Sequence, residues 1–172
     1  ANDSLFETSI KRGSIPLVSV DGAYMVTPGL GYIKVNRFAA TTYTEFKTAL
    51  TGLKKKGAQS LILDLRGNPG GFMEPAIQLV DDFLPQGAEV VSTQSKDKTI
   101  ERVTANSGGS FENKPVYVLV DEQTASAAEI IAGTLQDNDL GTIIGRRTFG
   151  KGLVQQEMPL GDGSSIRLTT AY

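Results

Sequence analysis

Ser126 and Lys151 are the two side chains in this sequence that could work together as a nucleophile and a general base. The chain contains no histidine and no cysteine. A Ser-His-Asp triad and a cysteine nucleophile are therefore excluded, and hydrolytic chemistry would need another proton acceptor. A lysine can act as that acceptor where burial lowers its pKa by about 2 to 3 units, so that the amine is neutral near pH 7.

Ser126 lies in the segment TASAAE, which spans residues 124–129 and opens a predicted helix directly after a buried strand. The helix dipole and the free N–H of Ala127 would stabilise the oxyanion that forms when a serine attacks a carbonyl. The spacing Ser126-x-x-Glu129 also fits a capping box, which is a common structural device. On this segment alone, the capping interpretation is favoured.

Lys151 lies between two glycines in the segment GRRTFGKG, residues 145–152, and Gln155 follows four positions later. The segment matches the first part of a phosphate-binding P-loop. Gly152 stands where that motif needs a serine or threonine, and a strand hairpin follows in place of a helix, so phosphate binding is disfavoured. An isolated lysine is ordinarily a solvated surface charge. Gln155, which is neutral and can donate or accept, could instead orient the amine of Lys151.

The segment DLRGNPGG, residues 64–71, ends in the paired glycines Gly70 and Gly71 before a predicted helix. Backbone N–H groups in such a turn can bind an anion, as an oxyanion hole requires. The glycines could equally do no more than relieve backbone strain. Their spacing does not fit a dinucleotide fingerprint. Each of the three segments is ambiguous alone, whereas their combination in a histidine-free chain favours a serine–lysine mechanism.

The apolar pattern predicts an α/β layered domain with a mostly parallel sheet, flanking helices and additional β-hairpins. Thr42-x-x-Glu45 predicts a capping box at the start of the first helix. The nearly continuous apolar run of residues 61–65 predicts a strand covered on both faces. The predicted elements are strands over 31–38, 61–65, 116–120 and 142–145, helices over 42–56, 72–84 and 125–136, and hairpins over 88–104 and 153–172.

The bulk composition narrows the possible partners. The chain has 172 residues with 40% hydrophobic content, which predicts one core. Lysine and arginine total 17 against 19 acidic residues, and the longest basic run is Lys54-Lys55-Lys56, so nucleic acid is a disfavoured partner. No apolar run is long enough for a membrane span. No motif implies a metal or an organic cofactor, because the carboxylates are scattered and imidazole and thiolate are absent.

Together, the three segments resemble the C-terminal processing peptidases, or tail-specific proteases, whose hallmarks are D-L-R-x-N-x-G-G, T-A-S-A-x-E and T-F-G-K-G-x-x-Q in this order. The resemblance covers residues 31–172 and implies a crotonase-like core. It implies Ser126 as the nucleophile, Lys151 as the general base and Gln155 as the residue that holds the lysine. It also implies an oxyanion hole from the N–H groups of Gly71 and Ala127, with Gly70 as the less favoured donor in the same turn.

The resemblance also carries expectations about the whole protein. Family members cut polypeptides near the C-terminus, commonly in apolar tails, and work in exported compartments. A PDZ domain usually precedes the core, so residues 1–30 are expected to be a linker or exit strands from a missing PDZ domain. Residues 31–172 are expected to be a peptidase core that is truncated at its C-terminal end. Weak or unregulated turnover of this fragment is the corresponding expectation, and the motifs do not specify an oligomeric state.

Two other hypotheses remain open at this point. The first is a catalytically silent peptide-binding or scaffold domain on the same fold. Such a domain is expected to have lost one of the side chains of Ser126, Lys151 and Gln155, and all of them are present. The second is a binder of acyl-CoA or a nucleotide that uses the glycine turns, an idea that rests on fold analogy alone.

Overall fold

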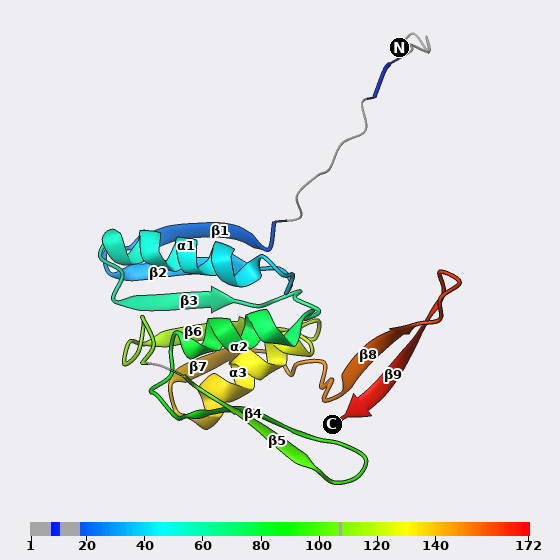
Figure 1. Cartoon of the computed structure of the whole chain (residues 1–172). Helices are drawn as coiled ribbons and strands as arrows, with labels where there is room; N and C mark the ends of the chain where they lie inside the picture. The colour runs from blue at the N-terminus through cyan, green and yellow to red at the C-terminus, as the bar shows by residue number, and fades with distance from the viewer. Residues whose placement is uncertain (1–7, 11–17, 107) are drawn as a thin grey trace.

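The computed structural model describes residues 8–10, 18–106 and 108–172, which form a five-stranded sheet, a layer of three helices and two hairpins (Figure 1). The predicted α/β fold with a mostly parallel sheet is confirmed. In chain order the elements are β1 (Val20–Thr27), β2 (Leu30–Val35), α1 (Thr42–Lys55), β3 (Ser60–Asp64), α2 (Met73–Asp81), β4 (Glu89–Gln94), β5 (Ile100–Thr104), β6 (Val116–Val120), α3 (Ala127–Asp137), β7 (Gly141–Gly145), β8 (Val154–Pro159) and β9 (Ser165–Ala171).

The order of strands in the main sheet decides which turns become neighbours. The order is β1-β2-β3-β6-β7; β2, β3, β6 and β7 are parallel, and β1 pairs antiparallel with β2. Neighbouring parallel strands end at the same edge of a sheet, where ligands of open α/β folds usually bind. The segments after β3, β6 and β7 therefore lie side by side, and they are the three segments that carry the candidate site residues.

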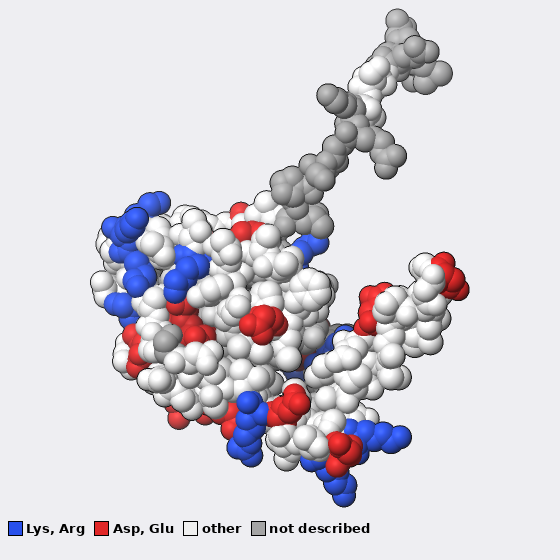
Figure 2. All heavy atoms as spheres, in the orientation of Figure 1, with Lys and Arg blue, Asp and Glu red and all other residues white. Residues whose placement is uncertain are grey.

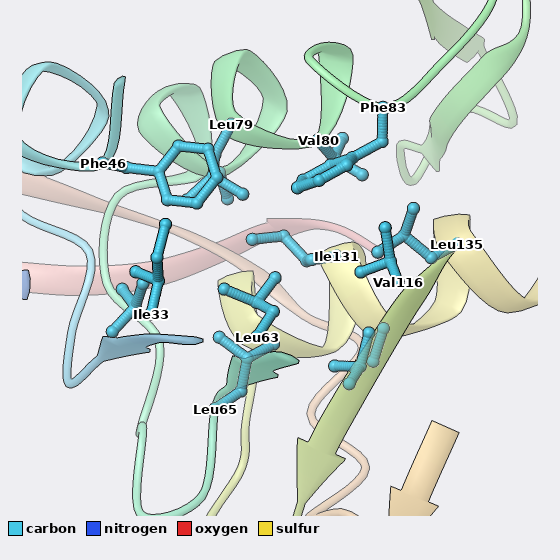
Figure 3. Packing of buried hydrophobic residues seen from close by; sticks show 14 of the residues in the cluster. Ile33, Phe46, Leu63, Leu65, Leu79, Val80, Phe83, Val116, Ile131 and Leu135 are labelled. Atoms are coloured by element: carbon cyan, nitrogen blue, oxygen red, sulfur yellow. The ribbon is translucent and has the colours of Figure 1, made fainter. Parts of the chain in front are cut away.

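The helices pack on one face of the sheet. Leu61 and Leu63 of β3 alternate toward this face and are fully buried, as are Phe46 of α1 and Ile131 of α3. Figure 3 shows labelled side chains from β2, β3, β6 and all three helices meeting in one cluster. Burial of this cluster is the main favourable term that holds the sheet and the helix layer together.

The opposite face of the sheet lacks such a layer in the described part of the chain. The strand register places Tyr24, Tyr32, Ile62 and Tyr117 in one cross-strand row on that face. Tyr24 is 53% exposed, Tyr117 is 37% exposed and Ile62 is half-buried. The expectation that residues 61–65 are covered on both faces is therefore met only in part among the described residues, because Asp64 is buried on this face whereas Ile62 is half-buried.

The start of α1 differs in detail from the prediction. The Oγ1 of Thr42 accepts the N–H of Ala39 at 2.8 Å, and the carboxylate of Glu45 accepts the N–H groups of Ser19 and Val20 at 2.7 and 3.0 Å. The capping box predicted between Thr42 and Glu45 is thus not formed. Glu45 instead ties the entry of β1 to α1, a long-range contact that local spacing does not encode.

The layered domain begins before residue 31. Residues 20–27 form β1, which pairs with β2 in the main sheet, so this part of the expected linker belongs to the core. Residues 1–7 and 11–17 lie outside the described residues. Descent of this segment from a PDZ domain stays a prediction.

Two hairpins complete the fold, and their ends meet. The N–H of Gln94 on β4 donates to the carbonyl of Tyr172 at 2.8 Å, and the N–H of Tyr172 donates back at 2.9 Å. The β8–β9 hairpin otherwise projects away from the main body (Figure 1). Met158, Ile166 and Leu168 on this hairpin are each about half exposed.

Charges are mixed over the surface. Figure 2 shows acidic and basic side chains scattered over the face in view, with basic ones gathered near the end of α1, whose last turn carries Lys54 and Lys55. The net charge of the chain is −2. Within the described residues, no helix is both long and apolar enough to cross a membrane.

The one-sided helix layer predicts unequal effects of neighbouring core substitutions in β3. Leu63→Ala should lower the free energy of unfolding by about 2–5 kcal/mol, because Leu63 is fully buried beneath the helices. Ile62→Ala, on the opposite face of the same strand, should cost markedly less. Urea denaturation of both variants checks this, and equal losses would show that both faces are equally buried.

Candidate functional site

Asn68 joins the turn after β3 to the segment that carries Ser126. It is fully buried. Its Nδ2 donates to the carbonyl of Val35 at 2.9 Å, and its Oδ1 accepts the N–H of Gly70 at 2.8 Å. Its carbonyl accepts the N–H of Ala125 at 3.0 Å. The end of β2, the glycine turn and the segment before Ser126 are therefore fixed to one another by a single residue.

The two turns are joined at two further points, and the third strand-end segment is bonded to one of them. Gly67 donates its N–H to the Asp121 carboxylate at 2.9 Å, and the hydroxyl of Thr124 donates to the carbonyl of Leu65 at 2.9 Å. Beyond the third strand end, the N–H of Phe149 donates to the carbonyl of Thr124 at 2.9 Å. All three strand-end segments are thus linked by hydrogen bonds around Thr124, which is fully buried.

Ser126 has a strained backbone at the start of α3. Its φ of 55° and ψ of −118° lie outside the regions that L-residues ordinarily occupy. Such conformations cost roughly 1–3 kcal/mol and persist where surrounding contacts enforce them. Here the N–H of Ala125 is held by Asn68, and the N–H of Ser126 donates to Glu129 Oε2 at 2.7 Å. The sharp turn leaves Ser126 facing a cavity at the strand ends.

Two backbone N–H groups beside Ser126 are free to bind an anion. Within the described residues, neither Gly71 nor Ala127 donates its N–H to a protein acceptor. The N–H of Gly70, by contrast, is already bonded to Asn68, which removes Gly70 from the expected donors. Gly71 has a φ of 143°, and a Cβ there would lie 2.1 Å from the carbonyl oxygen of Phe38, so only glycine fits this position.

Asp64 fixes the beginning of the glycine turn. This buried carboxylate receives hydrogen bonds from the hydroxyl of Tyr32 at 2.8 Å and from the backbone and guanidinium of Arg66 at 2.6–3.0 Å. Burial alone would raise the pKa of Asp64, but the bonds from Arg66, Tyr32 and Lys34 outweigh it and lower the pKa to about 2. Burial and the bond to Asp64 raise the pKa of Tyr32 to about 12.

Glu129 connects the Ser126 segment to the Lys151 segment. Its Oε2 accepts the N–H groups of Ser126 at 2.7 Å and Lys151 at 2.9 Å, and its Oε1 accepts the N–H of Gly150 at 2.6 Å. Burial would raise the pKa of Glu129, but the hydrogen bonds from Thr148 and these backbone groups lower it overall. The bond from the Ser126 N–H to Glu129 is the one that a capping box predicts, and the same carboxylate also holds the lysine segment in place.

Lys151 and Gln155 approach Ser126 from the base of the β8–β9 hairpin. The Nζ of Lys151 donates to the Oε1 of Gln155 at 3.1 Å. Ser126 and Lys151 are not directly hydrogen-bonded to each other. Both line one cavity of about 310 Å³ together with Gly71, Ala127 and Gln155. Its remaining walls are mainly apolar, with Phe72, Met73, Val91, Ile130, Leu153, Val154 and Tyr172 among them.

Five of the six sequence-predicted site residues thus line one cavity. The sixth, Gly70, packs closely against the Ser126 segment. A hydroxyl, an amine and two unpaired N–H donors around an apolar cavity suit nucleophilic attack on a carbonyl. Sequence reasoning missed the structural roles of Asn68 and Thr124, and it missed the bonds from the Lys151 segment to Glu129. Asn68, Thr124 and Glu129 all lie inside the motif segments, so their position beside the candidate site residues was the available signal.

Most of the chain matches one known protein family. A model of peptidase family S41 matches residues 29–172. The chain belongs to peptidase family S41. The matched region begins at residue 29, just before β2, and includes all three strand-end segments.

Relatives of this S41 chain include proteins named for C-terminal processing. It is 44% identical over 142 residues to a carboxyl-terminal-processing protease of Synechocystis, covering 83% of this chain and 33% of that protein. It is 41% identical over 165 residues to the carboxy-terminal processing protease CtpA of Bacillus subtilis, covering 96% and 35%. The S41 chain thus spans about a third of the length of these relatives.

A solved structure shares the fold. The photosystem II D1 C-terminal processing protease matches this S41 chain with a TM-score of 0.80 and 31% identity, over 93% of this chain and 44% of that one.

Substitution of Gly70 should test the contact between the two turns. In Gly70→Ala, the new Cβ would lie 2.6 Å from the carbonyl oxygen of Ala125 and 2.8 Å from the Cβ of Ser126. Gly29→Ala is the matched control, since Gly29 has a similar φ of 85° but no neighbour within 4 Å. Gly29→Ala should lose about 1–2 kcal/mol of stability from backbone strain, and Gly70→Ala roughly 1–3 kcal/mol more from overpacking. Thermal unfolding measures both; equal losses would contradict this packing.

Glu129→Gln should loosen the Lys151 segment. Loss of the charge weakens the bonds from the Gly150 and Lys151 amides, so their protection from hydrogen exchange should fall about tenfold. The native pKa of Glu129 lies below its unfolded value. The wild-type protection should therefore be complete above the unfolded pKa of about 4.3 and disappear as the pH falls through the lower native pKa.

Amide exchange followed by NMR, corrected for intrinsic rates, checks both parts of this prediction. Glu122→Gln is the control, because Glu122 is exposed and pairs only with Arg146. An unchanged profile in Glu129→Gln would show that the carboxylate does not hold this segment.

Proposed function

We propose that this chain is the catalytic core of a serine peptidase that uses a Ser-Lys dyad. In this mechanism Ser126 is the nucleophile, Lys151 is the general base, and the N–H groups of Gly71 and Ala127 form the oxyanion hole. The observation that supports it best is the single cavity lined by all four residues, with both N–H groups unpaired. Membership of a peptidase family supports the same reaction class.

The reaction begins with proton transfer from the Ser126 hydroxyl to the amine of Lys151. The Oγ of Ser126 forms a bond to the carbonyl carbon of the scissile peptide, and the resulting oxyanion is stabilised by the two N–H donors. The protonated Lys151 then gives its proton to the leaving amine as the C–N bond breaks. Water gives a proton to Lys151 and attacks the carbonyl carbon of the acyl-enzyme. The bond from this carbon to Ser126 Oγ then breaks, the new carboxyl terminus leaves, and Lys151 returns the proton to Oγ.

Gln155 orients the base in this scheme. Its Oε1 accepts one N–H of Lys151, and a neutral amide can do this without favouring the protonated amine as strongly as a carboxylate would. The Ser126 and Lys151 side chains line the same cavity without a mutual hydrogen bond. Catalytic hydrogen bonds commonly tighten only when substrate is bound.

The proposed substrates are polypeptides that are cut near their C-terminus, in tails with apolar ends. The names of the relatives support the position of the cut. The mainly apolar walls of the cavity support the preference for apolar residues. Work in an exported compartment and selection of tails by a PDZ domain belong to the same proposal, supported only by the family resemblance of the motifs.

Ser126→Ala and Lys151→Ala test the proposed dyad. Each should lower the rate of hydrolysis of casein, or of a peptide with an apolar C-terminal tail, by about 10³-fold or more in the complete natural protein. Lys151→Arg is the sharper variant, because it keeps the positive charge but a guanidinium cannot become neutral and act as a base. This variant should be as inactive as Lys151→Ala. Lys96→Ala on the exposed β4–β5 turn is the control and should retain wild-type rates.

An active Lys151→Arg variant would exclude lysine as the base. Hydrolysis that persists in Ser126→Ala would exclude Ser126 as the nucleophile. A complete natural protein that hydrolyses no tail would instead favour a peptide-binding domain without catalysis.

A further inference from the structure

We propose that Ile130, together with Val91, forms the wall that selects the substrate side chain immediately before the cleaved bond. This residue of the substrate, P1, carries the carbonyl that Ser126 attacks. The inference rests on the proposed peptidase function and specifies which residues choose its substrates.

The position of the oxyanion hole places the P1 side chain. When the carbonyl oxygen lies between the N–H groups of Gly71 and Ala127, the carbonyl carbon lies at Ser126. The P1 side chain is attached one bond further on and therefore enters the cavity that these residues line. The identity of its nearest walls then determines which side chains are accepted.

Ile130 is the residue of α3 best placed to contact that side chain. It follows Ser126 by four positions and lines the same cavity. Residues four apart lie on one face of a helix, and helical side chains lean toward the N-terminus. The side chain of Ile130 therefore leans back toward Ser126. Val91 of β4 lines the same cavity, and both residues are half-buried against the core.

The chemistry of the remaining walls favours an apolar P1 side chain. Met73 at the start of α2 and Leu153 before β8 line the cavity, and both are apolar. Among the described residues that line it, Lys151 alone is charged. A charged P1 side chain would lose its hydration without a partner other than the catalytic amine, which is unfavourable.

Ile130 also lines a second, neighbouring cavity. This second cavity of about 410 Å³ lies along β4 and α3 and shares Val91, Ser92 and Ile130 with the first. Its other walls are largely polar and include Thr134, Asp137 and Asn138. Since further empty space lies behind Ile130, removal of its side chain should lengthen the P1 pocket instead of allowing the core to collapse into it.

The test compares peptides that differ only at P1, with Ala, Val, Leu or Phe, in the complete natural protein. Wild type should prefer Val and Leu to Phe. Ile130→Ala should raise kcat/KM for the Phe peptide relative to the Val peptide by at least about tenfold, since one methylene changes such ratios by about 10–200-fold. Ile130→Phe should lower cleavage of the Leu peptide relative to the Ala peptide by a similar factor.

Competition between two peptides in one reaction gives these ratios independently of the folded fraction. Val91→Ala offers a second test from the opposite element and should also favour the Phe peptide. Ile144→Ala is the matched control, because Ile144 is an exposed isoleucine on β7 outside both cavities; its P1 ratios should equal those of wild type.

The outcomes separate this inference from the function on which it rests. P1 ratios that stay unchanged in both Ile130 variants and in Val91→Ala, while Ser126→Ala abolishes cleavage, would overturn the inference and leave the peptidase assignment standing. Cleavage that is insensitive to Ser126→Ala would overturn both. Opposite shifts in Ile130→Ala and Ile130→Phe support the assignment of this wall to P1.

Discussion

The hydrogen bonds of Asn68 are the constraint on which the arrangement of the site depends. An amide side chain that is fully buried must find partners for its donor and its acceptor, because an unpaired buried polar group costs about 1–3 kcal/mol. Asn68 finds them in the carbonyl of Val35 and the N–H of Gly70. Its carbonyl then holds Ala125 and, with it, the segment of Ser126. The oxyanion donors and the nucleophile thus share one rigid support.

Glu129 provides the second half of this arrangement, and it works across a larger distance in the chain. The Ser126 segment follows β6, whereas Lys151 follows β7 and lies at the base of a hairpin outside the main sheet. A single carboxylate that accepts three backbone N–H groups can keep these segments in register without contacting the reacting atoms itself. Hydrogen bonds to a charged acceptor are stronger than those between neutral groups, so Glu129 can hold together two segments that are far apart in the sequence.

Much of this could be predicted from the sequence, for identifiable reasons. Strands with continuous apolar runs, helices with regular apolar spacing and hairpins with glycine turns follow local patterns, and their predicted positions agree with the structure to within a few residues. The three motif segments could be located because each follows a predicted strand, and ligands of open α/β folds usually bind at strand ends. These segments could be expected to lie close together because strands and helices alternate over residues 31–145. This alternation favours parallel strands, which end at the same edge of a sheet.

The rest could not be predicted because it depends on contacts between distant residues. The carboxylate of Glu45 accepts the N–H groups of Ser19 and Val20, whereas local spacing predicts a capping box between Glu45 and Thr42. The incomplete burial of Ile62 on β3 does not follow from its apolar side chain. The occupation of the Gly70 N–H by Asn68, which leaves Gly71 as the free donor, depends on turn geometry at the level of single bonds.

Strain at Ser126 also bears on how the chain can change by mutation. A glycine would occupy its backbone conformation without the steric cost that serine carries. Loss of the nucleophile through such a change would therefore make the fold more stable. Descendants that no longer need catalysis would be expected to drift first at this position, while Asn68 and Glu129, whose loss destabilises, would persist. A silent descendant would then keep the shape of the site long after its chemistry had gone.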